Sequence, residues 1–410
     1  MNQTKALSAA PQNPVGAPVL PTRMRAARYH RVGEPFSIDI VDRPQARPND
    51  VVIQVKACSI VPNLINVIEH LARHPTLHSP PLPAIYGLDT VGVIVEKGAL
   101  VHGVEIGDRV YVNPMRYCGS CRFCRMGKVR ACEYAVFNGY FGKGAKSPQM
   151  YEDYPAGGFA EFMAAPQYSL VKLPDTLSFE TASRWGYLGT AYSALRHAGV
   201  NMSTTVLING VSGTLGLGAA LFALALGVPK ILGVGRNAEL LEQVKSLAPD
   251  RIHVLSTETD EQVASWAHSL TGGDGADVVV DALPTGASSQ AFLAAFAALA
   301  RGGTHVNIGG VLEDVPINVI RMMNDHQTCI GSYWFTTQEG QEMADLAGSG
   351  VVNLSAIENK VFALEDINAA LASIGKRHGG FSNYVISPEA ESLSGQATDS
   401  ELGRTPWFAE

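Results

Sequence analysis

Four of the six cysteines of this chain lie close together, at Cys118, Cys121, Cys124 and Cys132. Thiolates at the spacing C-x2-C-x2-C-x7-C can surround one tetrahedral Zn²⁺, and four protein ligands leave no open position for water or substrate. The spacing therefore predicts one structural zinc site rather than a catalytic one. The other two cysteines, Cys58 and Cys329, stand alone in apolar, strand-like segments, and we expect them to be buried thiols.

A second group of residues forms a glycine-rich turn of the kind that binds phosphate. The segment TTVLIN predicts a buried strand, and it runs directly into GVSGTLG and an apolar helix. At such a junction glycines permit a tight turn and let backbone N–H groups approach a pyrophosphate at the helix N-terminus. The alternative is a glycine-rich turn without a ligand. The cofactor contacts predicted here are Gly210, Ser212, Gly213, Thr214, Leu215 and Gly216.

The end of the next predicted strand, ILGVG, indicates which dinucleotide is bound. It leads into Gly235, Arg236 and Asn237, where an NAD site would place an acidic side chain for the ribose 2′-hydroxyl. No acid is present there, and the guanidinium of Arg236 suits a 2′-phosphate. The sequence therefore favours NADPH over NADH, with an exposed strand-end charge as the alternative for Arg236.

These residues fall in two styles of sequence. From residue 24 to 182 short apolar runs alternate with Pro and Gly, which predicts many short strands. From 183 to 332 predicted strands alternate with helical patterns, which predicts a parallel sheet with helices on both faces. Residues 333–388 add a helix and a last strand. The small and polar residues of 1–23 and 389–410 predict a flexible arm and a flexible tail.

Length and charge narrow the class of protein. A chain of 410 residues, 46% of them hydrophobic, is too long for one ordinary core and indicates two domains. The formal net charge of -7 lacks the basic footprint of a nucleic-acid binder. No apolar run is long enough to span a membrane, and the N-terminus lacks the apolar core of a secretory signal. We therefore expect a cytoplasmic protein with a small-molecule substrate, where clustered cysteines favour a metal over disulfides.

The order of these parts resembles that of the zinc-containing alcohol dehydrogenases of the medium-chain dehydrogenase/reductase superfamily. The match covers about residues 24–388, with the four-cysteine lobe at about 113–135, and includes EIGDRVYVNP, GGFAEFMAAP and TAYSALRHAGV. The resemblance implies a GroES-like, β-rich catalytic domain (24–182 and 333–388) and a Rossmann domain with a doubly wound parallel sheet (183–332). It also implies a cofactor in the cleft between them and a homodimer or homotetramer. By the same resemblance, the residues expected beside the nicotinamide ring are Thr190, Leu215, Leu283 and Ile308.

The family normally carries a second, catalytic zinc, and this chain departs from the family pattern at each ligand. Val61 stands at the position of the first Cys, Leu88 at the His of a Gly-His-Glu turn, and Gly186 at the third ligand. None of these side chains can bind zinc. Asn63 and Asn66 occupy the positions of the family's proton relay.

A relocated metal site is the alternative that the histidines leave open. His70, His74 and His78 repeat every four residues, which would align their imidazoles on one helix. Pro75 and the pair Pro80–Pro81 oppose a helix of that length. Exposed loop histidines are the competing interpretation.

Without a Lewis acid, hydride transfer is easiest to an activated C=C or C=N, because the charge then falls on a heteroatom that ordinary hydrogen-bond donors can hold. Zinc-free medium-chain relatives, the quinone oxidoreductases and enoyl reductases, are known for such reductions and have a similar glycine loop, although they generally lack the four-cysteine lobe. We therefore predict an NADPH-dependent reductase with Asn63, Asp89 and Tyr187 as candidate polar groups. Tyr333 and Trp334 suggest an apolar pocket or part of the core. The alternatives are an alcohol dehydrogenase or carbonyl reductase, and a cofactor-binding scaffold without turnover.

Overall fold

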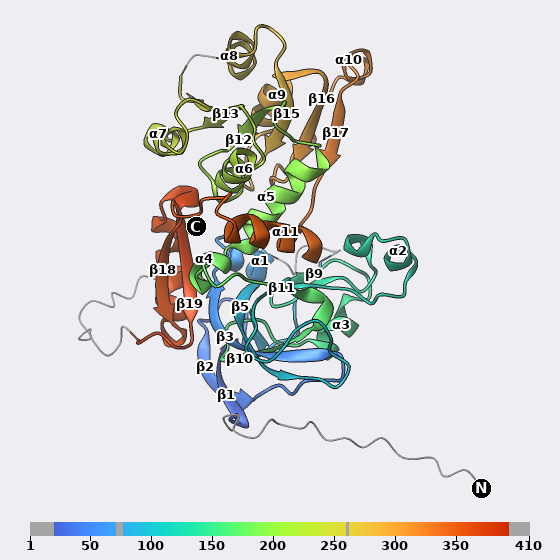
Figure 1. Cartoon of the computed structure of the whole chain (residues 1–410), viewed down its shortest axis with the longest axis vertical. Helices are drawn as coiled ribbons and strands as arrows, with labels where there is room; N and C mark the ends of the chain where they lie inside the picture. Colours follow the sequence, from blue (N-terminus) through green and yellow to red (C-terminus); the bar gives the residue numbers. More distant parts are fainter. Residues whose placement is uncertain (1–19, 71–76, 260–261, 393–410) are drawn as a thin grey trace.

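The computed structural model describes residues 20–70, 77–259 and 262–392. Within these ranges a β-rich part, in the lower half of Figure 1, is joined to a part with a parallel sheet flanked by helices, in the upper half. The predicted arm, 1–23, and the predicted tail, 389–410, lie largely outside the described residues. The predicted α/β class, with a β-rich part and a doubly wound parallel sheet, is confirmed.

The β-rich part is built on two mainly antiparallel sheets. The larger has the order β11-β6-β5-β3-β19-β18, with β10 also paired to β3, and the smaller has the order β2-β1-β4. The strands of the larger sheet are β3 (Asp50–Ser59), β5 (Asp89–Lys97), β6 (Arg109–Val112), β10 (Phe162–Pro166), β11 (Leu170–Lys172), β18 (Glu358–Ala363) and β19 (Ser382–Ser387). Those of the smaller are β1 (Arg23–Tyr29), β2 (Ser37–Asp42) and β4 (Ala84–Ile85).

Strand β3 is the centre of the larger sheet. Most of its residues are buried, in keeping with a β-branched and apolar sequence that packs on both faces. It pairs with β5 on one side, where Ser59 faces Asp89. On the other side it pairs with β19, where Ser59 faces Val385. The last strand of the described chain thus completes the sheet that the first third of the chain begins.

A lobe leaves this part between β6 and β10, and Figure 1 shows its helix α2 projecting to the right of the molecule. A small antiparallel sheet of order β7-β8-β9 anchors it. Its elements are β7 (Met115–Arg116), α2 (Arg122–Arg125), η2 (Val129–Ala131), β8 (Val136–Phe137), β9 (Phe141–Gly142) and α3 (Ser147–Asp153). The other short elements of the β-rich part are α1 (Leu64–His70), η3 (Gln167–Ser169), α4 (Phe179–Ala182), η4 (Leu364–Asp366), α12 (Ile367–Ser373), η5 (Ile374–Lys376) and η6 (Gly379–Phe381).

The second part holds a six-stranded, wholly parallel sheet of order β14-β13-β12-β15-β16-β17. This order is that of dinucleotide-binding sheets, whose ligands lie beyond the carboxyl ends of the strands where the order reverses. The strands are β12 (Thr205–Asn209), β13 (Lys230–Gly235), β14 (Ile252–Ser256), β15 (Ala276–Asp281), β16 (Leu299–Asn307) and β17 (Thr328–Gly331). The helices are α5 (Trp185–His197), α6 (Thr214–Ala225), α7 (Ala238–Ser246), α8 (Val263–Leu270), α9 (Ser289–Phe296) and α10 (Val319–Asn324).

Alternation along β12 divides the core between the two faces of this sheet. Val206 and Ile208 pack with α5, α6 and α7, whereas Leu207 packs with α8 and α9. Successive side chains of a strand point to opposite faces, so an uninterrupted apolar strand requires helices on both sides. The chain then returns to the β-rich part through α11 (Thr337–Gly348), where the indole N–H of Trp185 donates to the carbonyl of Gly340 at 3.1 Å.

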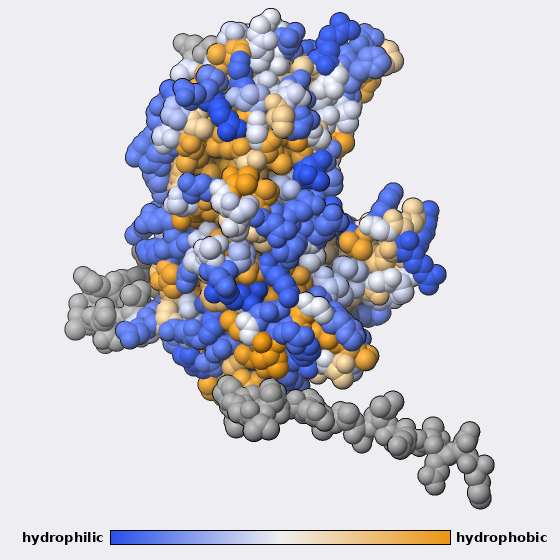
Figure 2. All heavy atoms as spheres, viewed as in Figure 1, coloured by the Kyte–Doolittle hydropathy of each residue, from blue (hydrophilic) through white to orange (hydrophobic). Residues whose placement is uncertain are grey.

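Polar side chains cover most of the face in Figure 2, with apolar patches between them. Among the described residues no helix combines the length and apolar character needed to cross a bilayer. Four large apolar side chains near α10 are more than 60% exposed, at Leu312, Val319, Ile320 and Met323.

Candidate functional site

The four cysteines converge in the projecting lobe. Their sulfur atoms all lie within 4.8 Å of one another, with 3.6 Å between Cys121 and Cys124 and 3.7 Å between Cys118 and Cys132. A tetrahedron of four sulfurs, each about 2.3 Å from zinc, has edges of about 3.8 Å. The donor set and its spacing therefore fit one zinc ion, and four soft thiolates favour zinc over hard cations.

Backbone N–H groups donate hydrogen bonds to these sulfurs, which stabilises the thiolate form. The amide of Cys121 donates to Sγ of Cys118 at 3.3 Å, and the amide of Cys118 donates to Sγ of Cys132 at 3.4 Å. The backbone N–H of Cys124 is the main cause that lowers the pKa of the Cys121 thiol to about 6. Burial raises the pKa of Cys124 and Cys132, and a bound cation would reverse that direction because it deprotonates its thiol ligands.

The three positions expected for the ligands of a catalytic zinc, 61, 88 and 186, hold no metal-binding side chain. Other atoms of the protein fill the space at position 186. Val61 and Leu88 are buried in the apolar core. A Cβ atom placed on Gly186 would lie 2.1 Å from Oδ1 and 2.6 Å from Oδ2 of Asp89. The Asp89 carboxylate thus fills the space into which a third ligand would project from α5. The residues present do not fit a catalytic zinc.

Asp89 is a fully buried carboxyl group at the start of β5. The hydroxyl of Tyr111 donates to its Oδ1 at 2.8 Å, while Oδ2 has no hydrogen-bond partner among the described residues. Burial raises the pKa of Asp89 to about 7, although the Tyr111 hydrogen bond and the charge of Arg184 oppose this shift. A carboxyl group with a pKa near 7 lies in the range that suits proton transfer at neutral pH.

Tyr187 lies one residue after Gly186 on α5, partly exposed, with the Arg184 guanidinium 5.1 Å from its ring centroid. Burial raises the pKa of Tyr187 to about 12, so the phenol keeps its proton and can donate a hydrogen bond. The charges of Arg184 and Asp89 both act on this phenol. The structure therefore brings Asp89 and Tyr187 together around Arg184.

Asn63 is not joined to this group. It directly precedes α1, and its Oδ1 accepts a hydrogen bond from Nδ2 of Asn66 at 3.0 Å. No hydrogen bond within the described residues links it to Asp89 or Tyr187. Its catalytic role stays a prediction.

The glycine turn has the geometry that phosphate binding requires. Gly210 has φ +85°, and a Cβ on Gly216 would lie 2.1 Å from the carbonyl oxygen of Gly210. Both positions therefore exclude side chains. Gly213 is the N-cap of α6 and offers no side chain to cap it, so the first N–H groups of the helix can meet an anion.

Arg184 places a positive charge at this helix start, and no sequence motif marked it. Its Nη2 donates to Oγ1 of Thr214 at 3.1 Å and to the carbonyl of Ser382 at 3.2 Å. The side chain is buried and forms no ion pair within 4 Å in the described part of the chain. Burial lowers the pKa of Arg184 to about 10, which still leaves a cation at neutral pH. A buried guanidinium at the N-terminus of α6 can hold a phosphate together with the backbone.

The predicted residues at the end of β13 have different surroundings. The side chain of Arg236 is exposed and forms no ion pair with a described carboxylate, so it is available to a 2′-phosphate. Asn237 is occupied locally, because its Oδ1 accepts from the amide of Leu240 at 3.0 Å and caps α7. Its side chain is therefore used as a helix cap.

Of the residues expected beside the nicotinamide, Leu283 and Ile308 follow neighbouring strands, Thr190 lies on α5 and Leu215 lies in the first turn of α6. A Cβ on Gly309, next to Ile308, would lie 2.7 Å from backbone atoms of Leu283, so the loops after β15 and β16 touch. Thr190 is buried, and its hydroxyl donates to the carbonyl of Gly186 within α5 at 2.8 Å. Their contacts to a cofactor stay predictions.

The three-histidine alternative falls largely outside the described residues. His74 and the side chain of His70 are not described, and the backbone of His78 forms a bridge with Gly142. Among the described residues, the four cysteines are the one cluster of Cys, His, Asp or Glu whose donor atoms converge.

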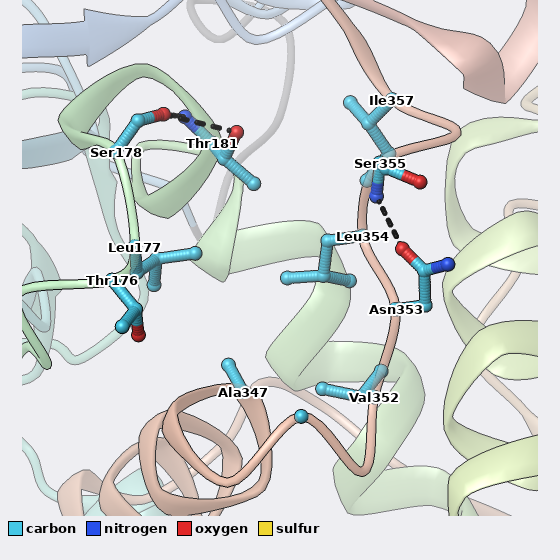
Figure 3. Close-up of a pocket in the computed structure, with 11 residues that line it drawn as sticks. Thr176, Leu177, Ser178, Thr181, Ala347, Val352, Asn353, Leu354, Ser355 and Ile357 are labelled. Carbon is cyan, nitrogen blue, oxygen red and sulfur yellow. Dashed lines mark hydrogen bonds between the residues drawn. The ribbon is translucent and has the colours of Figure 1, made fainter.

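A hollow of about 500 Å³ lies elsewhere, between residues 176–181, the end of α11 and the loop 350–357 (Figure 3). Its polar side chains serve the backbone nearby: Oγ of Ser178 accepts from the amide of Thr181, and Oδ1 of Asn353 accepts from the amide of Ser355. No side chain that lines it can titrate. The candidate chemistry therefore lies at Asp89 and Tyr187, not in this hollow.

Comparison with known families matches both parts of the chain. The model described as the alcohol dehydrogenase GroES-like domain matches residues 47–175. The model described as zinc-binding dehydrogenase matches residues 214–349.

Individual relatives match over nearly their whole length. An alcohol dehydrogenase of Geobacillus stearothermophilus is 32% identical over 348 residues, which is 84% of this chain and 94% of the relative. A protein of Sulfolobus acidocaldarius named NAD-dependent alcohol dehydrogenase is 27% identical over 86% of this chain and 96% of its own. The solved structure of a thermostable alcohol dehydrogenase from Pyrobaculum aerophilum has a TM-score of 0.69 at 26% identity, covering 89% of this chain and all of that one.

The four-cysteine site and the position of the family's catalytic zinc together predict the zinc content of the protein. We expect about one zinc per purified chain, because four thiolates bind one ion and the second site has no ligands. Changing Cys132→Ser should reduce this to nearly zero, whereas Cys329→Ser, a cysteine outside the cluster, should leave it unchanged. Elemental analysis of the dialysed protein measures both. Two zinc ions per chain would contradict the closed second site.

The raised pKa of Asp89 has a consequence for stability. Between about pH 4 and pH 7 the folded state keeps a proton that the unfolded state has lost, so this group makes the protein less stable as pH rises. Asp89→Asn removes that dependence, and its stability relative to the parent should increase by about 2–3 kcal/mol from about pH 5 to pH 8. Urea unfolding at the two pH values measures the difference. Asp42→Asn, at a carboxyl whose side chain is 95% exposed, is the control; an Asp89→Asn difference that is flat or opposite in sign would show that Asp89 is ionised in the folded state.

Proposed function

Since this chain belongs to the zinc-type alcohol dehydrogenases of the medium-chain dehydrogenase/reductase superfamily, and is an alcohol dehydrogenase-like NAD(P) oxidoreductase, we propose that it reduces an activated C=C or C=N with NADPH and without catalytic zinc. The observation that carries the proposal is the mutual fit of Gly186 and the Asp89 carboxylate. Oxidation of a simple alcohol calls for a group that stabilises an alkoxide, as a Lewis acid does. Reduction of a conjugated bond can proceed with hydrogen-bond donors alone.

The residues that bind the pyrophosphate in this proposal lie around the start of α6. The amides after Gly213 and the guanidinium of Arg184 together bind the pyrophosphate, and the close packing of Gly210 and Gly216 lets it approach the backbone. When bound, NADPH supplies a hydride to the electrophilic carbon of the substrate. Thr190 and the loops of Leu283 and Ile308 hold the ring beside that carbon.

The polar groups of the site handle the charge that develops on the conjugated heteroatom. Tyr187 keeps its proton at neutral pH and donates a hydrogen bond to this atom. Asp89, buried behind Gly186 and close to neutral in pKa, is the proton-holding group of the site. As hydride adds to carbon, the π electron pair moves to the heteroatom, which takes the proton of Tyr187, and the tyrosinate regains a proton from water. For a C=N this completes the reduction, whereas for a conjugated C=C the enol then tautomerises by moving its proton to the α-carbon.

The choice of NADPH rests on Arg236. Its exposed guanidinium has no carboxylate partner in the described structure, and no acid stands at residues 235–237 to bind a ribose 2′-hydroxyl. The relative from Sulfolobus acidocaldarius is named NAD-dependent, which supports the opposite preference. The residues of this chain favour the phosphate.

Two other functions remain candidates. The names of the relatives favour an alcohol dehydrogenase or carbonyl reductase, in which Asp89 would exchange the proton of the hydroxyl group. The loss of all three zinc ligands favours a scaffold that binds the cofactor without turnover.

A homodimer or homotetramer is the proposed assembly, in a cytoplasmic setting where the cysteine cluster stays reduced. Strand β17 is the edge of the parallel sheet, and the exposed apolar residues of α10 precede it in the chain. An unpaired edge beside apolar side chains suits pairing with a second copy. A particle with the mass of a single 43.6 kDa chain in sedimentation equilibrium would rule this assembly out.

A substrate screen decides between the reactions. Oxidation of NADPH should be fastest with enones, enals, quinones or imines and at least about tenfold slower with simple ketones. Reduction of a simple ketone puts the negative charge on a single alkoxide oxygen, which a Lewis acid normally stabilises. The loss of absorbance at 340 nm measures each rate. Activity confined to simple alcohols and ketones would support the alcohol dehydrogenase, and tight binding without turnover would support the scaffold.

The cofactor preference has its own test. Arg236→Ala should weaken NADPH binding roughly 10–100-fold and leave NADH almost unchanged, because a hydrogen bond to a charged group contributes about 1.5–3 kcal/mol. Fluorescence titration of both cofactors measures the two affinities. The control is Arg301→Ala, which changes an exposed arginine of β16 that lies 3.7 Å from Asp325. Equal losses for both cofactors, or tighter binding of NADH by the parent, would contradict the assignment of Arg236.

A further inference from the structure

A short segment, residues 332–335, carries the chain from the last strand of the nucleotide sheet back to the β-rich part. It lies between β17 and α11, and Trp334 within it has φ +64°. This left-handed conformation is disfavoured for a bulky side chain and persists only where its surroundings hold it. The contacts around Trp334 therefore decide the course of the segment.

Residues outside the segment hold it: Nε1 of Trp334 donates to Oδ1 of Asn113 at 3.0 Å, and the charged contacts to its backbone come from Arg130. Its Nη1 donates to the carbonyl of Trp334 at 3.1 Å and to that of Tyr333 at 3.4 Å. Its Nη2 lies 3.7 Å from Oε2 of Glu339, in the first turn of α11. One planar guanidinium thus joins two consecutive carbonyls and a carboxylate, a geometry that the ammonium of lysine cannot reproduce.

Arg130 belongs to the four-cysteine lobe. It lies in η2, between the third and fourth cysteines, and the amide of Cys132 donates to the carbonyl of Val129 at 3.1 Å. Sγ of Cys132 in turn accepts a hydrogen bond from the amide N–H of Cys118 at 3.4 Å. An ion that draws the four sulfurs together therefore fixes the backbone from which Arg130 extends.

The other side of the segment borders the candidate site. The ring of Tyr333 packs 5.2 Å from that of Phe137 and lies 3.5 Å from Nζ of Lys143. Its hydroxyl is buried without a partner among the described residues. Phe335, the last residue of the segment, packs with its ring centroid 6.1 Å from that of Tyr111, whose hydroxyl donates to Oδ1 of Asp89 at 2.8 Å. A shift of the segment would therefore move groups beside Asp89.

We propose that Arg130 is a positioning residue that transmits the metal state of the four-cysteine lobe to the segment 332–335, and through it to the cofactor and substrate site. In the metal-bound lobe Arg130 holds Trp334 in its left-handed conformation. When the metal is lost, η2 moves, the two carbonyls are released and the segment relaxes. The inference rests on the proposed function only in taking NADPH as the cofactor whose affinity is measured.

The experiment compares Arg130→Met and Arg130→Lys with Arg125→Met, a change of an exposed arginine in the same lobe. Zinc content, the emission of Trp334 and the affinity for NADPH are measured for each protein, and a Trp334→Phe variant identifies the share of Trp334 in the emission. We expect Arg130→Met to keep its zinc, to shift the Trp334 emission and to weaken NADPH binding about fivefold or more. Arg130→Lys should recover part of this, and Arg125→Met should match the parent.

Removal of zinc from the parent with a chelator completes the test. It should shift the Trp334 emission in the same direction as Arg130→Met, while chelation of Arg130→Met should add little, because the connection is already broken. Additive effects, or an Arg130→Met protein indistinguishable from Arg125→Met, would overturn the inference. If Arg130→Met binds no zinc, the zinc-bound Arg130→Lys decides the same question. A protein that shows these emission changes but reduces no substrate would contradict the proposed function alone.

Discussion

The contact between the Asp89 carboxylate and the backbone of Gly186 is the constraint around which the candidate site is arranged. Any side chain at position 186 would overlap the carboxylate, so the start of β5 and the start of α5 can approach only with glycine between them. Burial of an ionised carboxylate is costly without full pairing. Tyr111 satisfies one oxygen and the other has no partner among the described residues, and burial of the group raises its pKa to about 7. The contact therefore excludes a metal and provides an acid at the same place.

Arg184 connects this acid to the cofactor site. Its guanidinium acts on the charge of Asp89, lies over the ring of Tyr187 and donates to Thr214 at the start of α6. A buried cation needs anions nearby, and the protonated form of Asp89 offers little negative charge. A phosphate at the start of α6 would supply it. If the cofactor binds as proposed, its phosphate and the Asp89 carboxyl would both act on the charge of this one side chain.

The four-cysteine lobe supplies no reacting group to the proposed reaction, but it contacts a segment that leads to the candidate site. Its Arg130 reaches the carbonyls of Tyr333 and Trp334, where the chain turns back toward the β-rich part. Trp334 stores backbone strain there, of about 1–3 kcal/mol for such a conformation. Strain of this size persists because the lobe, β8 and α11 all hold the segment. The four-cysteine set is that of a structural zinc site, and its lobe contacts the segment 332–335 through Arg130.

The sequence by itself determined the parts whose signals are local. The spacing of the cysteines predicted a cluster whose sulfurs do converge, and the alternation of strands and helices predicted the doubly wound sheet. Val61, Leu88 and Gly186 leave the positions of the family's catalytic zinc without donor side chains. Only the tertiary structure decided which polar groups meet. Asp89, Tyr187 and Arg184 approach because β5 and α5 pack together, whereas Asn63 turns to Asn66 and Asn237 caps its own helix. Spacing along the chain reveals ligands of one short loop, but contacts between distant elements depend on packing that no local pattern records.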